Sequence, residues 1–135
     1  MNILRNILAV IVGAFVGGTV NMSIIMAGPS VVAPPNGIDT STMEGLLEAM
    51  PLMGPEHFIM PFLAHAIGTL VGAFLAALIA SSYKIWFALL IGVLFLIGGV
   101  MIAKQLPSPL WFDTTDVLLA YIPMAWLGWR FAGGK

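Results

Sequence analysis

The stretch that decides the fold is LVGAFLAALIASSYKIWFALLIGV (70–93), in which two apolar runs are separated only by the polar tetrapeptide SSYK (81–84). Crossing about 30 Å of hydrocarbon takes roughly 20 apolar residues as a helix, because every backbone amide must find its partner within the segment. Extended in both directions, the two runs cover about 57–80 and 85–103. A four-residue connection forces neighbouring helices to be antiparallel, so the sequence predicts a hairpin of two membrane helices.

Composition extends this prediction to the whole chain. Of its 135 residues 60% are hydrophobic and 8% are charged, whereas a soluble domain carries roughly 25% charged residues. Two further apolar stretches cover about 7–27 and 117–131. We therefore predict an all-α polytopic membrane protein, residues 1–135 forming a single domain of four antiparallel transmembrane helices in contact with the lipid bilayer.

Two residue classes exclude other kinds of function. The chain has no cysteine, which excludes disulfides, thiolate catalysis and cysteine-ligated metal clusters. Its few basic residues form no patch, so we expect no nucleic-acid partner.

The distribution of charge predicts the orientation of the helices. Basic residues gather at the side where both ends of the chain and the SSYK connection lie, and acidic residues gather at the other side with Lys104 as the one basic exception. By the positive-inside rule both termini are cytoplasmic and the protein is integral to the cytoplasmic (inner) membrane. The basic set is Arg5, Lys84, Arg130 and Lys135, and the acidic set is Asp39, Glu44, Glu48, Glu56, Asp113 and Asp116.

The outer loop 28–56 is the only long connection. Its Pro34-Pro35-Asn36-Gly37 run predicts a rigid segment that ends in a turn. Ser41 and Glu44 have the spacing of a capping box, which predicts a short amphipathic surface helix over about 42–50. Two interpretations stay open for this loop: a plain connector, or a lid over an outward-facing cavity.

The fourth apolar stretch has two features of its own. Asp113 and Asp116 precede it, where the helix dipole favours acids. Pro123 falls inside it and predicts a kink, because proline removes one backbone donor.

Small residues predict where helices pack. Gly13 and Gly17 form a G-x-x-x-G pair in the first stretch, and Gly68, Gly72 and Ala76 continue the same spacing in the second. We expect these helix-packing residues at contacts within one chain or between copies. Because four thin helices enclose little interior, we also predict a homo-oligomer.

A polar site is predicted from direction and depth. His65 points in the same direction as Thr69, Gly72 and Ala76, so it faces a helix contact. Asn21 lies at a similar depth, roughly 10 Å inside the outer end, and Tyr121 adds a polar tip in the same half. We expect Asn21, His65, Thr69 and Tyr121 to form a ligand-binding site. The alternative is an interhelical hydrogen bond that only fixes packing.

Metal and cofactor sites are weaker hypotheses. His57 and His65 are about 12 Å apart along one helix, too far to share an ion. Met22 and Met26 are one turn apart and would suit Cu(I), but methionine is also an ordinary core filler. Haem, quinone or metal binding through His65 or His57 therefore stays a minor alternative, and no metal site and no cofactor are assigned.

Two function classes remain. The G-x-S-x-G motif is missing and no acid lies within the predicted spans to orient His65, so we assign no catalytic residue and do not expect an enzyme. The first class is a transport- or channel-like protein that binds a small solute or ion in an outward-facing polar pocket. The second is an assembly module that docks a membrane-protein partner through glycine-rich helix faces.

Overall fold

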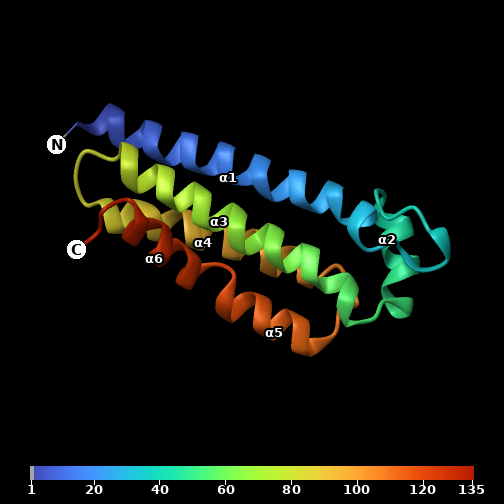
Figure 1. Cartoon of the computed structure of the whole chain (residues 1–135). Helices are drawn as coiled ribbons and strands as arrows, with labels where there is room; N and C mark the ends of the chain where they lie inside the picture. The colour runs from blue at the N-terminus through green and yellow to red at the C-terminus, as the bar shows by residue number, and fades with distance from the viewer. Residues whose placement is uncertain (1) are drawn as a thin grey trace.

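The computed structural model describes residues 2–135 and is all-helical, without strands in that range (Figure 1). The long helices α1 (Ile3–Val31), α3 (Ile59–Ile79) and α4 (Lys84–Ala103) lie side by side, and both ends of the chain lie at the end opposite α2 (Figure 1). Three helical segments within residues 2–135 are long and apolar enough to cross a membrane: Ile3–Val31, Pro55–Ile79 and Lys84–Ala103. The predicted α-helical class and the hairpin around SSYK are confirmed, and the long helices make a membrane protein plausible.

The fourth predicted helix is different from what the sequence suggested. Two short helices, α5 (Leu110–Leu119) and α6 (Ile122–Phe131), replace the single span predicted over 117–131. Pro109 caps the start of α5 in an extended conformation, so the helix begins seven residues before the predicted position. The helix is interrupted at Ala120 and Tyr121, just before Pro123, where a kink was predicted.

The outer loop folds into short turns and one helix. It contains 3₁₀ turns at Pro35–Gly37, Met50–Leu52 and Pro55–Phe58, and α2 covers Met43–Ala49. The predicted Ser41–Glu44 capping box is wrong, because the Thr42 hydroxyl accepts the bond from the Gly45 amide at 3.1 Å. Ser41 donates to Asp39 instead, and this shifts the helix start by one residue.

The predicted small-residue contact joins α1 to α3 inside one chain. A Cβ atom added at Gly13 would lie 2.6 Å from the Gly72 carbonyl oxygen and 3.1 Å from the Ala76 Cβ. One turn further along, a Cβ at Gly17 would lie 2.7 Å from the Gly68 carbonyl oxygen. Because the two backbones approach this closely, only glycine fits at the crossing.

The end of the bundle away from α2 is closed. The Asn6 side chain is buried and its Oδ1 accepts from the amide and the hydroxyl of Ser81, at 2.8 and 3.0 Å. The Arg5 guanidinium donates to the Ile79 carbonyl, and the Asn2 amide donates to the Ser81 hydroxyl. We call these four contacts the α1 clasp. A core of small residues fills the adjoining interior: Ala73, Ala76, Ala77, Ala88, Ile91 and Ala125.

Candidate functional site: a cavity with a buried histidine–aspartate pair

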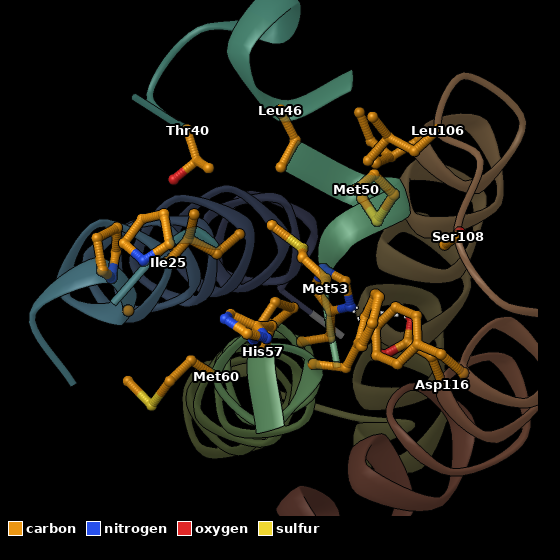
Figure 2. A pocket seen from close by; sticks show the side chains of 18 of the residues that line it. Ile25, Thr40, Leu46, Met50, Met53, His57, Met60, Leu106, Ser108 and Asp116 are labelled. Atoms are coloured by element: carbon orange, nitrogen blue, oxygen red, sulfur yellow. Dashed lines mark hydrogen bonds and ion pairs between the residues drawn. The ribbon is translucent and has the colours of Figure 1, made fainter. Parts of the chain in front are cut away.

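A cavity of about 610 Å³ opens at the end of the bundle that carries α2 (Figure 2). The cavity is lined by residues from the second half of α1, the outer loop, the first half of α3, the last turns of α4 and one face of α5. Figure 2 shows Met50, Met53 and Met60 on its walls and Asp116 at one side. The walls are therefore largely apolar and rich in methionine, while their polar groups are few.

The main polar feature of the cavity is a three-residue cluster. The His65 Nδ1–H donates to both carboxylate oxygens of Asp116, at 2.8 and 2.9 Å. The Tyr121 hydroxyl donates to Asp116 Oδ2 at 2.9 Å, and the imidazole and phenol rings are stacked with centroids 5.7 Å apart. The side chains of Asp116 and His65 are 6% and 18% exposed, and both residues line the cavity. We call this group the His65 cluster.

The early start of α5 explains how this cluster forms. Because the helix begins at Leu110, Asp116 lies in its second turn and faces α3 instead of lying outside the bundle. The break after Leu119 then turns the Tyr121 ring back toward the same carboxylate. Gly99 of α4 makes this possible, since a Cβ added there would overlap the Tyr121 hydroxyl.

The prediction that no acid orients His65 is therefore wrong. It rested on a helix start at 117, which placed Asp116 on the outer surface. The signal available in the sequence was the four-residue spacing of Phe112 and Asp116, which would put both on one helix face. In the structure both residues are buried. An aspartate that fixes one imidazole tautomer leaves Nε2 as the acceptor of the neutral ring, and no partner for Nε2 is present among residues 2–135. Of the two ring nitrogens of His65, Nδ1 is thus the one held by Asp116.

The other two predicted ligand-binding residues lie outside this cluster. Thr69 is fully buried one turn after His65, but its hydroxyl donates to the His65 carbonyl at 2.7 Å. Asn21 packs against Gly68, and its Oδ1 is buried without a hydrogen-bond partner in the part of the chain that the structure describes. Neither residue lines the cavity. The structure therefore brings together His65 and Tyr121, joined through Asp116.

His57 has a structural position despite lining the cavity. Its Nδ1 accepts from the Gly54 amide at 3.0 Å, and its Nε2 lies 3.1 Å from the Ala33 carbonyl oxygen, to which Nε2–H donates. The ring thus ties the chain after α1 to the start of α3. Both ring nitrogens of His57 thus have backbone partners in this structure.

The predicted methionines Met22 and Met26 line the cavity on α1. Within residues 2–135, no group of three histidine, aspartate or glutamate side chains lies close enough together to hold a metal ion. The thioethers of Met22 and Met26 are soft, polarisable groups in the cavity wall.

Two further acidic residues, Asp39 and Asp113, line the cavity. The Asp39 carboxylate accepts from the hydroxyl and the amide of Ser41, at 2.6 and 2.9 Å, and these bonds lower the pKa of Asp39 below its usual value. Asp113 accepts from the Ser108 hydroxyl at 2.6 Å. Both carboxylates are therefore held in place by neighbouring hydroxyl groups.

Comparison of the chain with known protein families, with curated proteins and with solved structures gave no match.

Proposed function

We propose that this chain is a small membrane transport protein that binds a small solute in the cavity next to His65. The observation that supports this most is the His65–Asp116 pair in the cavity wall. A buried charge costs several kcal/mol unless it is compensated, so an ionisable pair at membrane depth is a functional-site candidate by default. An apolar cavity with a few convergent polar groups is also the usual form of a small-molecule site.

The proposed topology has four crossings. In it α5 and α6 together form the fourth, and the break at Tyr121 is tolerated because the backbone there packs inside the bundle. Arg5, Lys84 and Arg130 would then lie on the cytoplasmic side of the inner membrane, and the cavity would face outward. In this arrangement α2 and its flanking turns would cover part of the opening as an outer surface helix.

The assembly module has less support than transport. Its proposed docking faces were the glycines of the first two helices, but Gly13, Gly17, Gly68 and Gly72 pack against one another within the chain. The homo-oligomer stays a prediction, and solute binding does not require one because a cavity already exists within one chain.

Cysteine labelling tests this proposal cleanly, because the chain has no cysteine of its own. Val117 lines the cavity, whereas its neighbour Leu118 is 64% exposed on the outside of the bundle. In proteoliposomes, a membrane-impermeant methanethiosulfonate added from the outer side should modify Val117→Cys at least tenfold faster than Leu118→Cys, because thiols ionise in water and not in lipid. Equal rates would overturn the proposed wet cavity.

The same variant separates transport from assembly. A transporter visits a second state open to the other side, so Val117→Cys should also react, more slowly, with reagent confined to the inner side. An assembly module would react from the outer side alone. If reagent on the inner side never modifies Val117→Cys, transport is contradicted, and the cavity is a static binding pocket.

A further inference from the structure

Apart from its two histidines, the cavity is lined by charged side chains of one sign, which is negative. The lining residues include three aspartates and two histidines but no lysine or arginine. Lys104 follows the last turn of α4 and is exposed, outside the lining. A cleft lined by one sign of charge with low-dielectric walls attracts ligands of the opposite sign.

The His65 cluster makes this preference depend on a proton. With the imidazole protonated, the His65–Asp116 pair has no net charge. With the imidazole neutral, the pair carries one negative charge, on a carboxylate that is only 6% exposed. Because an uncompensated charge in this environment is costly, the site favours one positive charge, held either on His65 or on a ligand.

The remaining titratable groups near the cavity are already engaged. The carboxylate of Asp39, in the loop, accepts a hydrogen bond from Ser41, and that of Asp113, in α5, accepts one from Ser108. His57 is hydrogen-bonded to backbone groups, and the Glu56 carboxylate lies 3.5 Å from its Nδ1. Tyr121 donates to Asp116. The helices α1 and α4 contribute no titratable side chain to the lining. The exchangeable proton is therefore assigned to His65.

The cavity wall decides the kind of cation. Hard metal ions need about six oxygen ligands, but the Asp116 oxygens are shared with His65 and Tyr121. Among residues 2–135 no group of three acidic or histidine side chains could hold such an ion. Five methionines together with Phe58 and Phe112 offer apolar, polarisable contacts instead. Aromatic faces and thioethers suit organic cations, whose charge is spread over an apolar surface.

We propose that the cavity binds an amphipathic organic cation, and that this cation and the proton on His65 replace each other as the partner of Asp116. When the cation enters, the Nε2 proton passes to cavity water, and the net charge of the site stays at zero. The inference rests on the proposed function, since it assigns a solute class to that cavity.

The test uses two ions of the same shape and opposite charge. Purified full-length protein in a neutral detergent is titrated calorimetrically with tetraphenylphosphonium and with tetraphenylborate, and the heats of detergent alone are subtracted. We expect the cation to bind at least tenfold more tightly than the anion. Titrations in buffers of different ionisation enthalpy should show up to one proton released per cation, and affinity should rise with pH as His65 loses its proton.

Three variants locate the charge. Asp116→Asn keeps the shape but removes the charge and should weaken cation binding roughly 30-fold. His65→Gln keeps a donor toward Asp116 and should abolish both proton release and the pH dependence. Glu44→Gln is the matched control, because it removes one exposed acid of α2 outside the cavity lining and should change affinity less than about threefold.

The outcomes separate the two proposals. Equal binding of both ions, or cation binding without proton release, would overturn the inference. Both results are measured on the unmodified protein, so they do not depend on the folding of any variant. If neither ion binds while Val117→Cys is still labelled from the outer side, the cation inference is wrong and the cavity stands. Absence of that labelling would remove the proposed function itself.

Discussion

The two histidines, only eight positions apart in the sequence, have different roles. The His57 ring is held by two backbone groups and joins the loop to the start of α3. The Nδ1 of His65 is fixed by Asp116, and the residue lines the cavity. The difference lies in the partners, because a ring with one free nitrogen retains the capacity to exchange a proton.

At the residue scale, Tyr121→Phe tests the cluster. The change removes the hydroxyl that donates to Asp116 but keeps the ring stacked on His65. Because a hydrogen bond to a charged group contributes about 1.5–3 kcal/mol, we expect the free energy of unfolding to fall by about that amount. Unfolding in mixed micelles, followed by circular dichroism, measures it.

The control for this substitution is Tyr83→Phe. Tyr83 is exposed and lies in the α3–α4 connection, so loss of its hydroxyl should change stability by less than about 0.5 kcal/mol. Equal effects at the two positions would mean that the Tyr121 hydroxyl contributes nothing specific to the bundle.

At the element scale, the contact between α1 and α3 depends on backbone approach. A methyl group at Gly17 would meet the Gly68 carbonyl oxygen at 2.7 Å and the Gly72 Cα at 2.9 Å. These are backbone atoms, which cannot move aside as the end of a flexible side chain can. Separation of the two helices is the only way to relieve the overlap.

We therefore expect Gly17→Ala to lower the free energy of unfolding by about 1–3 kcal/mol. Its neighbour Gly18 has nothing within 4 Å of an added Cβ, so Gly18→Ala should be neutral or gain up to about 1 kcal/mol from helix propensity. Thermal unfolding of the two variants in detergent gives the comparison. A destabilised Gly18→Ala with an unaffected Gly17→Ala would contradict the contact.

At the scale of the whole molecule, hydropathy predicted most of the fold because membrane helices differ so strongly from their connections. The turn at 81–84 and three long helices could be located from that contrast alone. The start of α5 could not, since Asp113 and Asp116 lower the hydropathy of a segment that is nevertheless helical.

The candidate site was predictable only in part, for a related reason. Depth and direction singled out His65 and Tyr121, but Asp116 is acceptable inside the bundle only because of a partner 51 positions earlier in the chain. Such a pair is invisible until the tertiary structure is known. For Asn21 the predicted helix face is right, because the residue packs against Gly68, but Asn21 does not line the cavity.

The α1 clasp and the cavity lie at opposite ends of the same helix, which makes the two halves of α1 unequal in cohesion. Near the clasp the α1 backbone packs closely against α3, whereas Met22, Ile25 and Met26 line the cavity. Deuterium uptake followed by mass spectrometry should therefore be faster for amides of 24–31 than for those of 8–17, because exchange follows local opening. Uniform uptake would contradict this. If the gradient exists, the part of α1 beyond Gly17 can move relative to α3 and change the width of the cavity, while the part held by the α1 clasp and the glycine contacts stays in place.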